Sequence, residues 1–214
     1  MAGGLPPLPP SYARGLELID AAHSEDPNKM DGPDGPGSLA CELRYARNMT
    51  KWLEARCPSA SPELQLACRA QHFKRWQLPR SSFPMTRPGY LTWRAKQKSQ
   101  AAADVASLLA SPSIAPPLSR EARDRVAALV RKDGLLSAHG DAETQALEDV
   151  ACLVFLDHQL DDFEAKAHID EDKMVVILRK TWAKMSQPGR QLALAMDLSD
   201  RARTLIGKAL EAAP

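Results

Sequence analysis

The chain has 214 residues, of which 44% are hydrophobic, so it is long enough for one domain with a substantial core. Lys and Arg total 28 and Asp and Glu total 27, and this balance excludes a general electrostatic attraction to nucleic acid or to anionic membranes. The four cysteines form no CxxC pair, and Cys68 and Cys152 lie in apolar runs. Free thiols in a reducing compartment are therefore expected.

The N-terminal residues 1–10, MAGGLPPLPP, predict a flexible or polyproline arm, followed by a single domain over residues 11–214. The arm lacks the apolar centre of a secretory signal and the arginine-rich pattern of a transit peptide. The longest unbroken apolar run covers residues 150–156, whereas about 20 residues are needed to cross a bilayer. We therefore expect a cytoplasmic protein that does not enter membranes.

Stretches rich in Pro and Gly separate segments that have helical spacing of apolar residues, and alternating strand patterns are absent. Ser61, followed by Pro62, and Ser119 are the residue types that begin helices. The predicted helices cover residues 39–56, a segment from 62 onward, 89–110, 119–132, 143–166, 171–185 and 199–212. The pattern predicts an all-α fold of seven or eight helices.

The predicted helix at residues 143–166 contains the run VACLVFL, which is apolar on all sides for about two turns. Such a helix is surrounded by neighbours, so we expect it at the centre of the fold. The predicted helix at residues 171–185 should end before Pro188 and Gly189, and the helix at 199–212 should pack on the outside.

Positive charge is concentrated in residues 64–103, which contain eight Lys or Arg, no Asp or Glu, and five of the eleven aromatic residues. One interpretation is a site for an anionic ligand or for single-stranded RNA, with guanidinium groups on phosphate and aromatic rings as stacking faces. The alternative is a solvated surface, or a face complementary to residues 141–172, which hold eleven acidic residues and one lysine. The candidate ligand-binding residues are Arg75, Arg80, Arg87, Tyr90 and Arg94. An irregular loop over about residues 78–88 is expected at the mouth of this pocket.

Three polar residues, Glu42, His72 and Asp149, lie on apolar faces of predicted helices. A buried polar group needs a partner, so these three are candidate ligands of a metal such as iron, manganese, zinc or magnesium. Alternatively each is a buried hydrogen-bonding group, for instance Glu42 or Asp149 paired with Arg75. In either case we predict that His72 and Asp149 lie within reach of each other.

His23 lies where a predicted helix runs into the loop SEDPN, a position suited either to a ligand contact or to a simple turn. Glu148 precedes Asp149 and is a further candidate for catalysis. The remaining histidines, His139, His158 and His168, have polar surroundings and are expected to be exposed.

The segments DAAHSEDPN, ELRYARNMTKWL, QHFKRWQLPRSSFPMTRPGYLTWR and LEDVACLVFLDHQLDDF together resemble the uncharacterised family known as domain of unknown function 4202, over about residues 12–211. The order of helices is also similar to that of the HD-domain superfamily of metal-dependent phosphohydrolases. That resemblance puts Glu42 at the place of the first metal-binding histidine and Asp149 at the last. Gln71-His72 or His72-Phe73 would replace the His-Asp pair. His23 would match the substrate-side histidine of the guanosine-tetraphosphate hydrolases.

The resemblance implies an HD-domain-like helical bundle and a metal-dependent phosphohydrolase for a phosphorylated small molecule or nucleotide. In that reaction Glu42, His72 and Asp149 would hold the metal, and His23 and Glu148 would assist catalysis. The arginines would neutralise phosphate charge. Two alternatives stay open: a metal-free ligand- or RNA-binding module that kept the cleft without catalysis, and an HD-type iron oxygenase.

Overall fold

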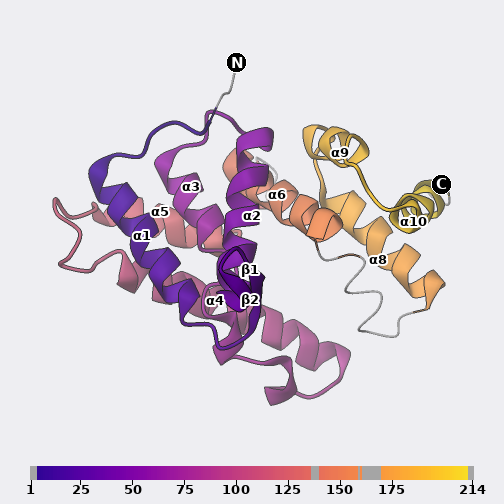
Figure 1. Ribbon diagram of the computed structural model, residues 1–214, viewed down its shortest axis with the longest axis horizontal. Coiled ribbons are helices and arrows are strands. Elements are labelled where there is room, and N and C mark those ends of the chain that lie inside the picture. Colours follow the sequence, from indigo (N-terminus) through magenta and orange to yellow (C-terminus); the bar gives the residue numbers. More distant parts are fainter. Residues whose placement is uncertain (1–3, 136–139, 159, 161–169, 212–214) are drawn as a thin grey trace.

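A computed structural model of the chain describes residues 4–135, 140–158, 160 and 170–211. Within these residues the protein has nine α-helices, two short 3₁₀ helices and one two-stranded sheet (Figure 1). In chain order the elements are α1 (Pro10–Ser24), β1 (Lys29–Gly32), β2 (Gly35–Ala40), α2 (Cys41–Arg56), α3 (Pro62–Arg69), η1 (Arg75–Gln77), η2 (Arg80–Ser82), α4 (Arg87–Leu108), α5 (Arg120–Arg131), α6 (Ala142–His158), α8 (Glu171–Lys184), α9 (Gln187–Leu194) and α10 (Asp200–Glu211). The predicted all-α class is confirmed.

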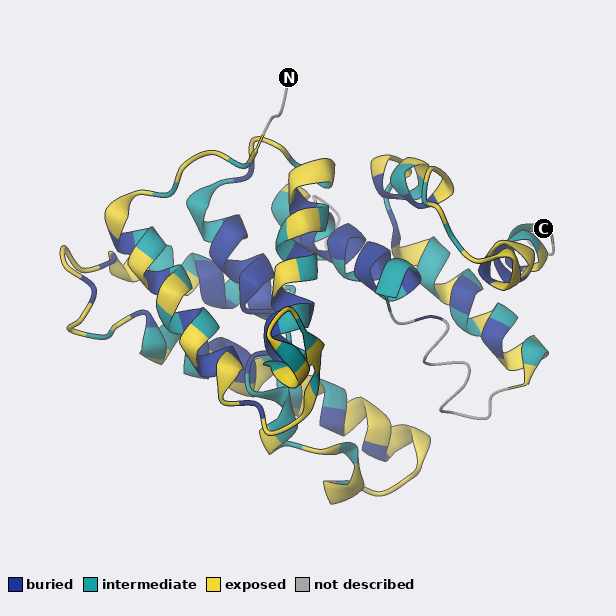
Figure 2. Cartoon of the chain, viewed as in Figure 1, coloured by how far each residue is buried: buried dark blue, intermediate teal, exposed yellow. Residues whose placement is uncertain are grey.

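Helix α6 is the central element, as its apolar sequence predicts. It contacts α2, α3, α5, α8 and α9, and its residues belong to both hydrophobic clusters of the protein. Leu147 packs in the cluster formed with α1 to α5, and Leu153 packs in the cluster formed with α8, α9 and α10. Figure 1 shows the two groups of helices at opposite ends of α6, and Figure 2 shows how little of α6 is exposed. The predicted continuation of this helix to residue 166 lies outside the described residues.

The predicted helix starts are confirmed at both serine caps. The hydroxyl of Ser61 accepts a hydrogen bond from the Leu64 amide at 3.1 Å, and that of Ser119 accepts one from the Ala122 amide at 3.1 Å. The predicted count of seven or eight helices is too low, because α9 was not expected. Pro188 and Gly189 do not only end the preceding helix: with Ser186 as N-cap they form the first turn of the next one.

The expectation that strands are absent is wrong for one hairpin. Strands β1 and β2 pair antiparallel, with Lys29 opposite Ala40 and Gly32 opposite Gly35. The hairpin is largely exposed, so its sequence has no marked apolar alternation. The dipeptide Asp34-Gly35 carried the available signal, since such pairs are typical of hairpin turns and Gly35 adopts a φ of +115°.

The described part of the N-terminal arm lies against the domain. Leu5 packs on the larger hydrophobic cluster, and the Pro6 carbonyl accepts a hydrogen bond of 3.1 Å from the Gln65 side chain. Among the described helices, none is both long and apolar enough to span a membrane.

Candidate functional site

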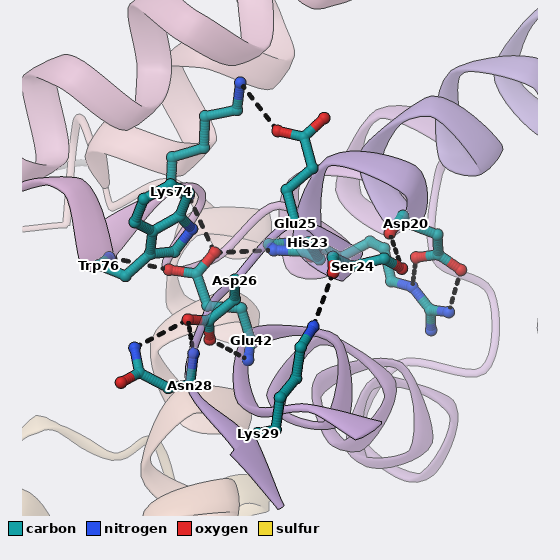
Figure 3. Close-up of polar contacts among 11 residues, drawn as sticks. Asp20, His23, Ser24, Glu25, Asp26, Asn28, Lys29, Glu42, Lys74 and Trp76 are labelled. Atoms are coloured by element: carbon teal, nitrogen blue, oxygen red, sulfur yellow. Dashed lines mark hydrogen bonds and ion pairs between the residues drawn. The ribbon is translucent and has the colours of Figure 1, made fainter. Parts of the chain in front are cut away.

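A buried polar network joins the end of α1 to the start of α2 (Figure 3). The His23 side chain is fully buried, with Nδ1 3.2 Å from Oε2 of Glu42 and Nε2 2.9 Å from the Arg69 carbonyl oxygen. Both ring nitrogens thus contact oxygen atoms of the protein. His23 therefore ties the end of α1 to Glu42 of α2 and to the end of α3.

Glu42 also holds the loop that comes after α3. Its Oε2 accepts the backbone N–H of Lys74 at 3.0 Å and its Oε1 accepts that of Trp76 at 3.2 Å (Figure 3). Asp26 in turn accepts the backbone N–H of Glu42 at 3.0 Å, which satisfies one of the unpaired donors at the start of α2. Through these bonds to Glu42, the network holds the backbone of the loop after α3 in place.

That loop contains unusual backbone conformations. Among the described residues only three residues other than glycine have a positive φ: His72 at 63°, Lys74 at 49° and Lys132 at 62°. A side chain in this left-handed region costs of order 1 to 3 kcal/mol, and such residues cluster at functional sites. All three line the same cavity.

The cavity has a volume of about 920 Å³, within the usual range for small-molecule sites. Its walls come from β1, α2, the loop after α3, α4, the end of α5, α6 and α8. A smaller cavity of about 330 Å³ shares Tyr45, His72, Arg75 and Trp93 with it.

The wall of the cavity is strongly basic. Glu148 is its only carboxylate among the described residues. The cationic lining residues are Arg44, Lys74, Arg75, Arg80, Arg94, Lys98, Lys132 and Lys184. Such an excess of one sign in a concave wall concentrates the potential and attracts anions.

His72 and Arg75 are held in fixed positions at this wall. The His72 ring stacks on Tyr45 with centroids 4.0 Å apart, and its Nε2 lies 2.8 Å from Nη1 of Arg75. A guanidinium can only donate, so Nε2 accepts and the imidazole is neutral. Burial, together with Arg75 and Arg94, lowers the pKa of His72 well below its ordinary value, which agrees with that form. Arg75 also lies over the ring of Trp93, 5.1 Å from its centroid.

Glu148, which also lies in the cavity wall, is paired with two lysines. Its carboxylate contacts Nζ of Lys132, and its Oε1 lies 3.8 Å from Nζ of Lys184. Burial acts to raise the pKa of Glu148, but Lys132, Lys184 and Lys98 outweigh it, so the pKa is lowered. Glu148 is therefore an ionised counter-charge for the lysines.

Asp149, the next residue, points away from this cavity into a separate cluster. Its carboxylate is fully buried and accepts hydrogen bonds from Arg56 Nε at 2.7 Å, the Ser186 amide at 2.8 Å and the Gln145 side chain at 3.0 Å. A Cβ on Gly189 would lie 2.7 Å from its Cγ, so only glycine lets α9 approach this closely. Asp149 thus fastens α9 to α6 and to the end of α2.

The comparisons with known proteins give a family without an assigned activity. The family described as "Domain of unknown function (DUF4202)" matches residues 13–206. The chain belongs to this family. The search of curated proteins and the search of solved structures each gave no match.

The residues predicted as metal ligands in this DUF4202 chain are not brought together. Glu42 lies in the network with His23, His72 faces Tyr45 and Arg75, and Asp149 is bonded to Arg56. In the described part of the chain, no hydrogen bond or ion pair joins His72 to Asp149, and none joins Arg75 to Glu42 or to Asp149; the bonds of these residues go to other partners. Within the described residues no group of three or more His, Cys, Asp or Glu could hold a metal ion. Each carboxylate already accepts hydrogen bonds from the protein. This agrees with the alternative prediction that these residues are buried hydrogen-bonding groups.

Most of the predicted ligand-binding residues of the DUF4202 chain lie in the cavity wall. Arg75, Arg80, Tyr90 and Arg94 all line the cavity, and the guanidinium of Arg80 lies 6.0 Å from the centroid of the Trp93 ring. Arg87 does not: it is exposed at the first position of α4 and is not a lining residue. The predicted loop at residues 78–88 contains η2 and contributes Leu78 and Arg80 to the wall. His158 is only partly exposed, and His139 and His168 lie outside the described residues.

The described ion pairs of the basic segment of the DUF4202 chain, residues 64–103, are made with residues outside the acidic segment. Within the described residues no ion pair joins residues 64–103 to residues 141–172: Arg69 pairs with Asp20 and Lys74 with Glu25. Asp141 pairs instead with Arg125, from another segment. Among the described residues, the two segments therefore lack the ion pairs expected for two complementary faces.

Sequence reasoning did not single out Arg44 or the four lysines of the cavity, Lys74, Lys98, Lys132 and Lys184. Lys98 could have been found, because it lies one helical turn after Arg94 and so shares its face. Lys132 and Lys184 stand at the ends of α5 and α8, far away in sequence. Nothing in their local sequence indicates that both reach Glu148.

Proposed function

We propose that this protein binds a phosphorylated small molecule of about nucleotide size in the basic cavity. The observation that carries the proposal is the composition of the wall, with eight Lys or Arg and a single carboxylate among its described residues around about 920 Å³. Partly desolvated cations without counter-charges are costly, and phosphate is an anion that arginine binds with two parallel hydrogen bonds and lysine binds as a point charge. The cavity therefore favours a ligand that brings several negative charges.

Aromatic side chains at the same wall support an organic ligand with a flat ring. The stacked pair of Tyr45 and His72 lies beside Arg75, and Tyr90 and Trp93 form a second pair with centroids 5.8 Å apart. Tyr90 is 46% exposed, so one of these faces is open to a ligand. A nucleotide has both parts that such a wall would contact, a phosphate and an aromatic base.

The metal-dependent phosphohydrolase implied by the resemblance to HD-domain proteins does not fit the described residues. The oxygens of Glu42 accept two backbone N–H groups, those of Asp149 accept donors from Arg56, Ser186 and Gln145, and Nε2 of His72 accepts from Arg75. Their lone pairs face protein donors and not an open coordination position. We therefore derive no step through a metal, and propose binding as the function.

The test is a binding screen by calorimetry, with nucleoside phosphates, sugar phosphates and their unphosphorylated counterparts. Arg75→Met and Arg94→Met should each weaken binding of the best phosphorylated ligand by about tenfold or more, because a charge-assisted hydrogen bond contributes about 1.5 to 3 kcal/mol. Arg87→Met is the matched control: it lies on the same helix as Arg94 but outside the cavity, and should leave the affinity unchanged.

Phosphate release, followed in the same samples with and without added Mn²⁺ or Mg²⁺, would show whether the bound ligand is hydrolysed. The proposal is overturned if no phosphorylated compound binds the wild type, or if Arg87→Met weakens binding as much as Arg75→Met. Steeply salt-dependent binding of a single-stranded RNA, without binding of any small phosphate, would support the RNA alternative instead.

A further inference from the structure

Four elements bring charged side chains to one end of the cavity. Lys98 comes from α4, Lys132 from the end of α5, Glu148 from α6 and Lys184 from the last position of α8. We call these four residues the lysine cluster. Its centre is Glu148, whose carboxylate contacts Lys132 and lies 3.8 Å from Lys184.

The cluster contains three ammonium groups and one carboxylate, an excess of two positive charges. Lys132 and Glu148 are the most buried of the four, with side chains 9% exposed each. Lys98 forms no ion pair within the described residues, and burial together with Lys132 and Arg94 lowers its pKa. Lys98 and Lys132 are like charges in partly desolvated surroundings, which is unfavourable, so this arrangement favours a further anion. Lys184, whose side chain is 54% exposed, adds a third positive charge.

Lys132 gives a second indication that the cluster is a built feature. It adopts the left-handed conformation at φ 62° at the C-terminal end of α5, where glycine or asparagine is the usual residue. A lysine there is disfavoured by its backbone, yet this conformation places its ammonium group on Glu148. We therefore attribute the lysine at this position to the contact of its ammonium group with Glu148, and not to the preference of the turn.

The cluster adjoins the arginine wall of the proposed phosphate site through α4. Arg94 and Lys98 are one turn apart on that helix, so their Cβ atoms are separated by roughly 5–6 Å, and both line the cavity. The electrostatic influence of Arg94 extends to His72 on one side and to Lys98 on the other. A ligand phosphate at Arg75 and Arg94 would therefore have the lysine cluster as the next positive contact.

We propose that the ligand carries at least two linked phosphates, the first held by Arg75 and Arg94 and the next by Lys98 and Lys184 of the lysine cluster. The ligand class is thus a di- or triphosphate and not a monophosphate. This inference rests on the proposed function, because it names the substrate class of the same cavity. Lys132 keeps Glu148 neutralised, so Lys98 and Lys184 are the two lysines that the ligand would engage.

The series orthophosphate, pyrophosphate and tripolyphosphate tests this directly, because it changes the number of phosphates without any organic part. Full-length wild type should bind tripolyphosphate about tenfold or more tightly than orthophosphate in calorimetry without divalent metal. The double variant K98M/K184M should lose about tenfold in affinity for tripolyphosphate and change less than about twofold for orthophosphate.

The matched control is K96M/K180M, which removes one lysine from each of the same two helices and lowers the net charge equally. Lys96 and Lys180 are exposed and do not line the cavity, so this variant should bind like the wild type. K98R/K184R should keep the preference for the longer phosphate and would exclude misfolding as the cause of any loss.

The inference is overturned if the three phosphates bind the wild type equally, or if K96M/K180M loses as much as K98M/K184M. In either case, binding of organic monophosphates that depends on Arg75 and Arg94 would leave the proposed function intact. If no phosphate compound binds the wild type at all, the proposed function fails together with the inference.

Discussion

Two clusters of charged residues surround Glu148 and Asp149, which are adjacent in α6, and they differ in their balance of positive and negative charge. Asp149 is fully buried and accepts hydrogen bonds from Arg56, Ser186 and Gln145, so one carboxylate is matched by donors from three parts of the chain. Glu148 is one carboxylate among several cations. Around Asp149 the negative charge is matched by the positive charge of Arg56. Around Glu148 positive charges outnumber the single carboxylate.

The difference separates a structural role from a ligand-binding role. A cluster whose donors and acceptors match needs nothing else, and removing one partner should mainly lower stability. A cluster with an excess of one sign is incomplete without a ligand, and removing one of its cations should mainly lower affinity. The network of His23 and Glu42 belongs to the first kind, since every carboxylate oxygen of Glu42 has donors.

The largest expected effect is the loss of stability in Asp149→Ala. The substitution leaves Arg56, with 16% of its side chain exposed, without a carboxylate, and also removes the acceptor for Ser186 and Gln145. Breaking a buried ion pair in this way costs about 3–5 kcal/mol, which urea denaturation would measure. Asp197→Ala is the control: Asp197 also lies 2.7 Å from an arginine, but its side chain is fully exposed, so no measurable change is expected. Equal effects of the two substitutions would contradict the structural role of Asp149.

A somewhat smaller effect is expected for Glu42→Ala. His23, which is fully buried, would lose a hydrogen-bond partner, and the N–H groups of Lys74 and Trp76 would lose their acceptor. We expect a loss of about 3 kcal/mol in the free energy of unfolding, and faster hydrogen exchange at residues 72–77 because this loop is then no longer held.

Glu54→Ala, an exposed substitution on the same helix, should change neither the stability nor the exchange rates. Unchanged exchange at residues 72–77 in Glu42→Ala would show that the network does not position the cavity wall.

The smallest effect is expected for the partly exposed pair of Asp141 and Arg125. Two hydrogen bonds from Arg125, at 2.5 and 3.0 Å, lower the pKa of Asp141 to about 2. Because the folded-state pKa lies below the unfolded value, the ionised carboxylate stabilises the fold above about pH 4. That contribution is lost as the pH falls from about 4 to about 2. With solvent screening we expect it to be about 1 kcal/mol.

Asp141→Asn should therefore be less stable than the wild type by about 1 kcal/mol at pH 6, and the difference should shrink in urea titrations at pH 4 and pH 3. Asp124→Asn, which affects an exposed pair with Arg120, is the control and should show no such dependence. A difference for Asp141→Asn that stays constant from pH 6 to pH 3 would contradict the assigned ion pair.

Much of the fold could be predicted because helices carry local signals. The caps at Ser61 and Ser119 and the all-round apolar run in α6 each act within a few residues, and all three are found as predicted. The hairpin and α9 were missed because Pro and Gly indicate where a segment ends but not the type of the next element. Pro188 begins a helix where an end was expected.

The site could be predicted only in part, because the partners of a buried charge are set by packing between distant segments. An inward-facing Glu42 was predicted correctly, but its pairing with His23 and with backbone amides depends on the loop after α3. Arg94 and Lys98 lie one turn apart on α4 and could be found together, whereas Lys132 and Lys184 reach Glu148 only through the packing of three helices. A carboxylate on an apolar face predicts a partner, but not which partner.

The most direct test of the central claim, that the excess of cations in the cavity is completed by phosphate, is a crystal structure of the protein grown with its best phosphorylated ligand. The account predicts a phosphate in contact with Arg75 and Arg94, the ring of the ligand against the aromatic wall, and Asp149 unchanged in its bonds to Arg56. A ligand bound at the cluster of Asp149 or on the outer face of the molecule, with the cavity left to solvent, would contradict it.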